Sequence, residues 1–392
     1  MDFRKLKKIF YKIKIILNCK WYFSNPKKNK YLFFDYNNHE MLSKYLKIKK
    51  FTILSTRYEK FNLFFLLKVL LSFKFKNIYI NYQIALIKFI NPKYIITLTD
   101  NNIIFYQIKK IFPSIKFICI QNSTRFCLGD FCDSHDKIRK FKIKKRSVDL
   151  FFVQDKISYL FLSKFFNSKF IILGSFKNNT VQIKKGKKIP NILFISQWRD
   201  HKKIIVQDKE YPFKIFAKSE IDLLKILIKY CYQNNILLDI KLTSRDVKEI
   251  NFYKTILEKS KVKFRFLNFS LNLRKNYSLL DYYNLVVTCD STLGFECIMR
   301  RIKTIFYSTR YCYLKISKKT LPNHLSNLIK MKKDEKSFYL DTLVSNKVLY
   351  NFIDLNYESS YTMWYKKNYR IIKNFLFFDY ENKKIKKILK IK

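Results

Sequence analysis

Short apolar runs alternate with helix-length segments along most of the chain, and this alternation predicts the fold class. The runs of the first half are residues 31–35, 51–54, 77–82, 94–100, 117–122, 150–155 and 170–175. They are apolar on both faces, and segments of helical period such as Asn102 to Ile111 separate them. Runs of this kind form parallel sheets whose two faces are covered by helices. The first half therefore predicts a doubly wound α/β unit.

A polar segment rich in Asn and Lys, residues 177–190, interrupts this pattern. A second alternating series follows, with strand-like runs at residues 191–197, 236–243, 262–268, 285–290 and 303–309. Helical patterns lie between these runs, at 219–234, at 247–260 and from residue 293. The chain therefore predicts a second doubly wound unit, joined to the first by a linker.

The predicted organisation is an α/β protein with two Rossmann-like domains and terminal helices. Its parts are an amphipathic basic helix (1–25), a first domain (26–182), a linker (183–190), a second domain (191–315) and a helical C-terminal region (316–392). In the first helix, apolar residues recur at helical spacing from Phe3 to Leu17 with Lys and Arg between them. Two interpretations stay open: the apolar stripe packs on the body of the protein, or residues 1–20 lie on the anionic inner leaflet of a membrane.

The composition adds a large positive charge, +51 from 80 Lys plus Arg against 29 Asp plus Glu. The enriched residues are those of codons made only of A and T, so codon bias offers an explanation for much of this charge. The lysines are spread through the chain and no nucleic-acid-binding motif occurs, so we expect no nucleic-acid partner. The apolar window 61–75 contains Lys68 and is too short to cross a bilayer. With no visible signal peptide and no regular cysteine pairing, the sequence predicts a cytoplasmic protein.

Polar clusters stand at the carboxyl ends of the predicted strands, where ligands bind in open parallel sheets. Two sheets whose strand ends face each other define a cleft, and these clusters predict its lining. On the first domain the predicted lining residues are Asn101, Gln121, Asn122, Arg125, Ser175 and Asn178. On the second domain the clusters are residues 196–199, 243–245 and 290–294.

The run DSTLGFE, Asp290 to Glu296, predicts a helix that begins directly after a strand. The first N–H groups of such a helix and the positive end of its dipole favour an anion. Ser291 and Thr292 add hydroxyls, Gly294 leaves room for a phosphate beside the backbone, and Glu296 is expected to be exposed enough to bind ribose hydroxyls. A second interpretation stays open, in which the polar residues only cap the helix and Gly294 allows close helix packing.

The order of these motifs resembles a bacterial family of transferases of surface carbohydrate biosynthesis, related in shape to glycosyltransferases of the GT-B type. The matching segments are TDNN (99–102), IQNS (120–123), GSFKNN (174–179), DSTLGFE (290–296) and Arg300. The resemblance covers roughly residues 30 to 310, and it departs at Ser123, where the family usually has glycine. It implies two Rossmann-like domains facing a cleft, with the acceptor held mainly by the first and a nucleotide-activated donor by the second. It also implies that the terminal helices cross back onto the first domain.

Enzymes of the GT-B type stabilise the leaving phosphate with a helix N-terminus and basic side chains in place of a metal. We assign Glu296 to the ribose of the donor nucleotide and a group of residues to its phosphates. The phosphate-binding residues are Ser291, Thr292, Gly294, Arg199 and Arg245. No other cofactor is expected.

The acceptor hydroxyl requires a base, for which Asp100 is the first candidate and His135 and Asp130 are the alternatives. Asp100 is equally well explained as the cap of the following helix. Cys127, Cys132 and His135 have irregular spacing and no fourth ligand nearby, so we expect no metal site.

Three classes of function stay open. The first is a transferase that moves a sugar from a nucleotide-activated donor to a glycan or a lipid-linked acceptor in surface polysaccharide assembly. The second is another enzyme on the same fold, either a polyol-phosphate transferase using a donor like CDP-glycerol or a nucleotide-sugar epimerase. The third is a basic protein without catalytic activity that binds a membrane surface or nucleic acid, which rests on the charge of +51 and on the first twenty residues.

Overall fold

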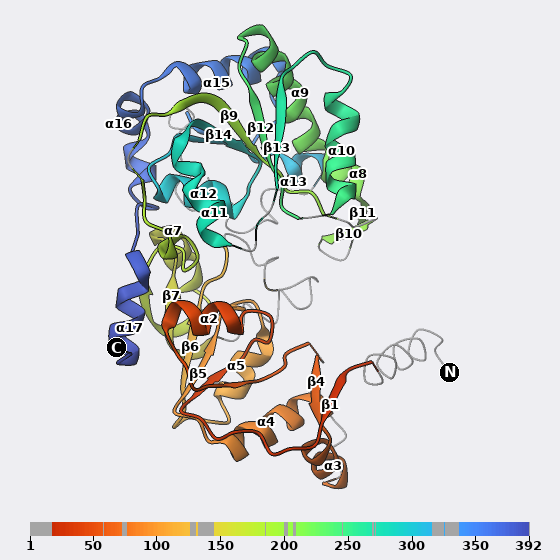
Figure 1. The fold of residues 1–392 in the computed structure, drawn as a ribbon, viewed down its shortest axis with the longest axis vertical. Helices are drawn as coiled ribbons and strands as arrows, with labels where there is room; N and C mark the ends of the chain where they lie inside the picture. The colour runs from red at the N-terminus through yellow and green to blue at the C-terminus, as the bar shows by residue number, and fades with distance from the viewer. Residues whose placement is uncertain are drawn as a thin grey trace.

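The computed structural model describes most of the chain (Figure 1). The described residues are 18–57, 59–72, 77–125, 131, 145–184, 186–199, 203–206, 209–244, 246–268, 270, 272–315, 325 and 337–391. The amphipathic helix predicted at the N-terminus lies almost entirely outside them. None of the helices in these ranges has the length and apolar character needed to cross a membrane.

Parallel strands form a six-stranded sheet in the first domain, in the order β3-β2-β5-β6-β7-β8. Their bounds are β2 Tyr31–Phe33, β3 Thr52–Ile53, β5 Tyr94–Thr97, β6 Lys116–Ile120, β7 Arg146–Val153 and β8 Phe166–Ile172. One face packs on α3 (Leu63–Leu71), α4 (Ile78–Ile90), α5 (Ile103–Lys109) and α7 (Lys156–Leu162). The other face packs on α2 (His39–Leu46) and α17 (Lys383–Leu389). A separate parallel pair, β1 (Lys20–Tyr22) and β4 (Lys60–Asn62), lies at the end of this domain that is farther from the second domain.

The second domain repeats this architecture with a six-stranded parallel sheet in the order β13-β12-β9-β14-β15-β16. Its strands are β9 Ile189–Ile195, β12 Leu238–Lys241, β13 Phe264–Leu267, β14 Tyr283–Thr288, β15 Thr304–Tyr307 and β16 Tyr339–Leu340. One face packs on α9 (Lys218–Gln233), α10 (Val247–Leu257), α15 (Asn346–Glu358) and α16 (Tyr361–Ile372). The other face packs on α11 (Leu273–Ser278) and η3 (Leu280–Tyr282), and α12 (Thr292–Met299) contributes to both clusters.

The remaining elements are short connections around the two sheets. They are η2 (Asn178–Thr180), the antiparallel hairpin β10 (Lys203–Val206) and β11 (Lys209–Pro212), α8 (Phe213–Phe216), α13 (Arg310–Tyr313) and η5 (Tyr380–Asn382). The predicted fold class, two Rossmann-like α/β domains, is therefore confirmed by two parallel sheets with helices on both faces.

One predicted strand is wrong: residues 77–82 begin the helix α4. The buried side chains of α4, from Tyr82 to Ile90, recur at helical spacing, but the helix is apolar on nearly every side because it packs between the sheet and α3. A short apolar run of this kind cannot be told from a buried strand by periodicity alone.

The chain crosses between the domains twice, and the two crossings run side by side along one edge of the molecule (Figure 1). The first crossing leads from β8 through η2 to β9, and the second leads from α16 through η5 to α17. The Nδ2 of Asn179 donates to Oδ1 of Asn382 at 3.0 Å, and the Asp379 N–H donates to Oδ1 of Asn179 at 3.1 Å. Gly174 has a φ of +86°, and a Cβ there would overlap the carbonyl group of Phe377. Glycine is therefore required where the second crossing passes the end of β8.

Candidate active site between the two sheets

The strand order reverses once in each sheet, between β2 and β5 in the first and between β9 and β14 in the second. Ligands of open α/β sheets bind outside the strand ends at such a reversal. In the first domain, the Thr99 hydroxyl donates to the Asp35 carboxylate across the reversal. In the second, the Asp290 N–H donates to Oε1 of Gln197 at 3.0 Å. Polar side chains therefore bridge both reversal points.

The first turn of α12 stands beside the second of these points, as the sequence predicts. Ser291 caps the helix, because its hydroxyl accepts the Leu293 N–H at 3.2 Å. The hydroxyl oxygen of Thr292 accepts the Thr124 N–H at 3.3 Å and lies 3.2 Å from the Thr124 hydroxyl. Thr124 belongs to the loop after β6, so the start of α12 touches the strand ends of the first domain.

Gly294 faces the sheet of its own domain. A Cβ at this position would lie 2.7 Å from Cγ2 of Thr288 and 2.9 Å from Cε1 of Phe306. The Gly294 N–H donates to the Ser291 carbonyl at 3.0 Å. This geometry favours the interpretation in which glycine allows close packing of the helix on β14 and β15.

Glu296 is buried, with 3% of its surface exposed, so the expectation of an exposed side chain is wrong. Its carboxylate accepts a hydrogen bond from the hydroxyl of Ser175, which follows β8. It accepts a second one, at 2.8 Å, from the hydroxyl of Tyr277 on α11. Burial raises the pKa of Glu296, while these two hydrogen bonds and the charge of Lys177 act in the opposite direction. Glu296 thus joins the second domain to the end of the last strand of the first.

Lys177 brings a positive charge to the same place. It is half-buried and follows Ser175 by two residues, at the start of the first crossing. Burial lowers the pKa of its ammonium group, and the carboxylates of Glu296, Asp100 and Asp35 oppose that shift. Its carbonyl accepts hydrogen bonds from Thr180, whereas its ammonium group makes no hydrogen bond or ion pair within the described part of the chain. Lys177 therefore places a positive charge between the two domains, with carboxylates of both domains near it.

Asp100, the candidate base, is fully buried and paired with Arg125. The guanidinium donates to both carboxylate oxygens, from Nε at 2.9 Å and from Nη2 at 3.0 Å. The Asn122 N–H adds a third bond, to Oδ1 at 3.3 Å. With these donors in place, the carboxylate orients Arg125 and the loop after β6.

Several polar atoms at the strand ends of the first sheet are buried without a hydrogen-bond partner among the described residues. They are Oδ1 of Asn122 after β6, both amide atoms of Gln154 after β7 and Nδ2 of Asn178 after β8. Leaving such a group unpaired costs about 1–3 kcal/mol, and native proteins keep few of them. These four atoms belong to three residues that follow adjacent strands, and two further oxygens without a partner in the described ranges belong to Glu59, directly before β4, and to Gln83 on α4.

Arg310 completes the second domain's side of the cleft. It donates to Asp290 at 3.1 Å and to Gln197 at 3.3 Å, and its guanidinium carbon lies 3.9 Å from the ring centre of Phe216. Its Nε is buried without a partner among the described residues. Arg310 therefore retains an unsatisfied donor next to α12.

The other predicted site residues fall in three groups. Gln121 is buried and ties the loop after β6 to β7 and α7, while Asn101 and Arg199 are exposed at the ends of β5 and β9. Arg245, His135 and Asp130 lie outside the described residues, as do Cys127 and Cys132. The described ranges contain no group of three or more His, Cys, Asp or Glu side chains that could hold a metal ion.

Arg300, at the other end of α12, is a clamp on the segment directly before the linker, residues 178–182. It pairs with Asp281 through Nε at 2.7 Å and Nη2 at 2.5 Å. Its other N–H groups donate to Oδ1 of Asn178 at 2.8 Å and to the carbonyls of Val181 at 3.0 Å and Gln182 at 3.1 Å. All five donors of the guanidinium are thus used within the protein. Asn178 is predicted to line the cleft, but its side-chain oxygen accepts a hydrogen bond from Arg300.

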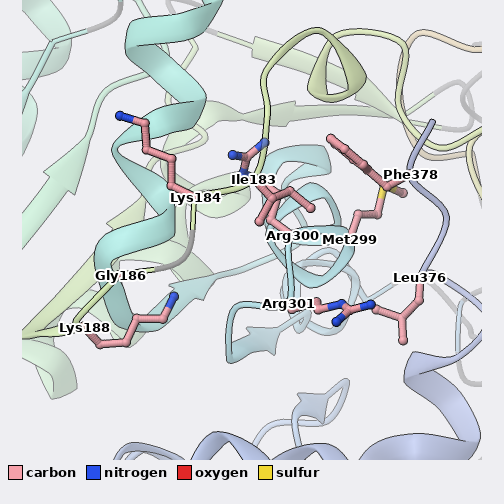
Figure 2. A pocket seen from close by; sticks show the side chains of 9 residues that line it. All are labelled: Ile183, Lys184, Gly186, Lys188, Met299, Arg300, Arg301, Leu376 and Phe378. Atoms are coloured by element: carbon pink, nitrogen blue, oxygen red, sulfur yellow. The ribbon is translucent and has the colours of Figure 1, made fainter. Parts of the chain in front are cut away.

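A cavity of about 580 Å³ lies behind this clamp, between the linker, the end of α12 and the second crossing. Lys184, Lys188 and Arg301 line it together with Met299, Leu376 and Phe378. In Figure 2 the amine of Lys184 and the guanidinium of Arg301 point in different directions. The amine of Lys188 donates to the carbonyl of Asp281 at 2.5 Å. The cations do not converge on one point, so this cavity is not the predicted donor site.

A protein-family model described as "putative O-antigen biosynthesis protein" matches residues 118–392. The chain belongs to this family. No protein of curated function matches the sequence.

Solved structures support the fold of this family member. A "putative UDP-N-acetylglucosamine 2-epimerase" from Listeria monocytogenes aligns with a TM-score of 0.55 and 9% identity, over 93% of this chain and 96% of that one. A UDP complex of S. aureus MnaA gives 0.54 and 11%, over 93% and 98%. The wall teichoic acid polymerase TagF gives 0.53 and 11%, over 99% and 95%. At these identities the likeness is one of fold.

Sequence reasoning missed several residues of the site. Asp35 and Lys177 stand at strand ends, so their positions carried a signal, and Lys177 lies inside the GSFKNN motif. Gln197 lies in the predicted cluster 196–199, but its bond to Asp290 was not predicted. Tyr277 carried none, because its contact with Glu296 depends on how α11 packs against α12.

Proposed function

We propose that the protein transfers a sugar from a nucleotide-activated donor to a glycan or lipid-linked acceptor during O-antigen assembly. The observation that carries this proposal is the pair of contacts between α12 and the first domain, from Thr292 to Thr124 and from Glu296 to Ser175. They bring a helix N-terminus, suited to phosphate, to the strand ends where polar groups lack partners. Membership of the O-antigen family and the two-domain fold support it.

In this proposal the donor diphosphate lies at the start of α12. The hydroxyls of Ser291 and Thr292, the dipole of α12 and the charge of Lys177 stabilise the phosphate that leaves, without a metal ion. Arg199 at the end of β9 and Arg245 assist. Glu296 holds the ribose after releasing the Ser175 hydroxyl. Since leaving-group charge develops during transfer, these groups act most strongly in the transition state.

The acceptor is proposed to lie against the first domain, where Asn122 and Gln154 provide unpaired amide groups for sugar hydroxyls. Asp100 stays the predicted base. Its pairing with Arg125 also suits a positioning role, in which Asp100 holds Arg125 towards the cleft. The variants Asp100→Asn and Arg125→Ala distinguish the two roles. If Asp100 is the base, Asp100→Asn abolishes transfer. If Asp100 is a positioning residue, Arg125→Ala causes the same loss of transfer as Asp100→Asn.

Calorimetry of the purified protein against UDP, GDP, CDP and CMP tests the proposal. We expect one nucleoside diphosphate to bind, and Ser291→Ala to weaken binding about tenfold through loss of a hydroxyl contact. Ser345→Ala is the matched control, because Ser345 caps α15 in the same way and is remote in sequence from α12. Both variants lose a helix cap worth about 1 kcal/mol, and only Ser291→Ala should weaken binding.

The panel also separates the alternatives. Absence of binding to all four nucleotides contradicts the proposal and favours a protein without catalytic activity. Binding of CMP together with turnover of CDP-glycerol favours polyol-phosphate transfer, because that transfer releases CMP. Turnover of a nucleotide sugar in the absence of any acceptor favours epimerisation.

A further inference from the structure

The helix α3 carries an apolar face that the core does not explain. Its inner side chains, Phe65 and Val69, are 2% and 5% exposed and pack in the core of the first domain. On the opposite side, Phe64, Leu67 and Leu71 are 58%, 47% and 75% exposed. Their spacing places all three along one side of the helix.

Phe23 lies near the start of this helix. It is 72% exposed and follows β1, whose last residue pairs with the last residue of β4, directly before α3 begins. We call Phe23, Phe64, Leu67 and Leu71 the α3 face. Single exposed apolar residues are ordinary, but a contiguous group of large ones marks an interaction site in a soluble protein.

The α3 face stands on a fixed support. Asn62 caps α3 by accepting the Phe65 N–H at 3.2 Å, and its own N–H donates to the Tyr82 hydroxyl at 2.7 Å. The Asn62 amide also donates to the Ser24 carbonyl at 2.8 Å, which ties the segment after β1 to the start of α3. The apolar side chains are therefore presented by ordered backbone.

The sequence around the α3 face is positively charged, and this charge indicates the kind of partner that the face binds. No acidic residue occurs from Phe3 to Phe34 or from Lys60 to Thr99. The second of these segments contains Lys60, Lys68, Lys74, Lys76, Lys88 and Lys93. Of these, Lys68 is exposed on α3 itself. Apolar side chains among lysines, without acidic residues in the same segment, suit an anionic lipid surface. A nucleic acid would contact the lysines but would not bury Phe64, Leu67 and Leu71.

We propose that the α3 face docks the protein on an anionic lipid bilayer by inserting Phe23, Phe64, Leu67 and Leu71 among the lipid headgroups. The nine residues of α3 extend about 14 Å, so the helix lies in the interface and does not cross it. In Figure 1, α3 stands at the end of the first domain that is farthest from the second domain. Docking there leaves the cleft open, and it does not depend on the reaction proposed above.

Sedimentation of the full chain with vesicles tests this inference, using phosphatidylcholine mixed with phosphatidylglycerol and phosphatidylcholine alone. We expect binding to the anionic vesicles only, and a fall of at least about tenfold in the partition constant for the triple variant Phe64→Ser, Leu67→Ser, Leu71→Ser. The control variant Val348→Ser, Leu355→Ser removes side chains that are 50% and 53% exposed on α15 and should bind as the unmodified protein does. Circular dichroism and the melting temperature establish that the variants fold.

A second measurement reports insertion directly. In the variant Leu71→Trp, the tryptophan emission should shift to shorter wavelength on adding anionic vesicles, and brominated lipid should quench it. Vesicle binding that is unchanged in the triple variant would overturn the inference, as would equal binding to vesicles without phosphatidylglycerol. It is also overturned if light scattering finds a dimer that the triple variant converts to a monomer, because the α3 face would then join two copies of the chain.

Discussion

Arg300 and Arg310 are both buried arginines of the second domain paired with an aspartate, but their surroundings differ. Arg300 uses all five N–H donors on Asp281, Asn178 and two carbonyls. Arg310 contacts Asp290 and Gln197, and its Nε has no partner in the described structure. A saturated arginine holds a fold together, whereas an unsaturated one beside a helix N-terminus is suited to bind a ligand. The clamp of Arg300 therefore has a structural role, whereas Arg310 stands at the cleft with a donor left to offer.

The largest expected effect is the loss of the saturated pair. Arg300→Met should lower the free energy of unfolding by about 3–5 kcal/mol, because it leaves Asp281 buried without its cation. Urea denaturation measures this change. The control is Lys218→Met, which breaks a pair with Asp222 whose lysine side chain is 51% exposed and should cost less than about 1 kcal/mol. Equal losses in the two variants would show that saturation does not distinguish the Arg300 clamp.

Gly294→Ala should come next, with a loss of about 1–3 kcal/mol in the free energy of unfolding. The added Cβ meets Thr288 and Phe306, and a close-packed interior accommodates it only by moving them. Adding Thr288→Ser removes Cγ2 and should restore part of the stability. If Gly294→Ala instead keeps full stability and loses nucleotide affinity, the glycine makes room for a phosphate and the packing explanation is wrong.

Lys177→Met should leave stability nearly unchanged and weaken nucleoside diphosphate binding about 10- to 100-fold, the worth of one charge-assisted contact. Calorimetry measures the affinity, and Lys164→Met, an exposed lysine in the turn before β8, is the control. The nucleoside monophosphate should lose less affinity than the diphosphate. Nucleotide binding that is tight and equal in both variants would remove Lys177 from the site while leaving the proposed reaction intact.

The smallest expected effect is a change in pH dependence. Burial lowers the pKa of Lys177, so its positive charge is lost at a lower pH than that of an exposed lysine, and diphosphate affinity should fall as pH rises through that value. In Lys177→Arg the charge persists, so the fall should flatten. Glu296, Asp100 and Asp35, the carboxylates that face Lys177, are the same in both proteins. Parallel curves would contradict the assignment.

Most strands of the two six-stranded sheets and their polar ends were predictable because apolar periodicity and turn residues are local signals. The run LVVTCDS already contains the last four residues of β14 and the cap of α12. What could not be predicted depends on packing between distant segments. The contact of Thr292 with Thr124 joins residues 168 positions apart, and the burial of Glu296 follows from Ser175 of the other domain. The direction of Gly294 likewise depends on which side of α12 meets the sheet.

The paired crossings have a mechanical consequence. Two chain segments that join the domains side by side should resist twisting and sliding of one domain against the other. They leave one rotation, about the line that passes through both segments. The two crossings are held together by the bond between Asn179 and Asn382 and by the close approach of Gly174 to Phe377. We therefore expect any separation of the facing strand ends to occur on the side of the molecule away from the two crossings.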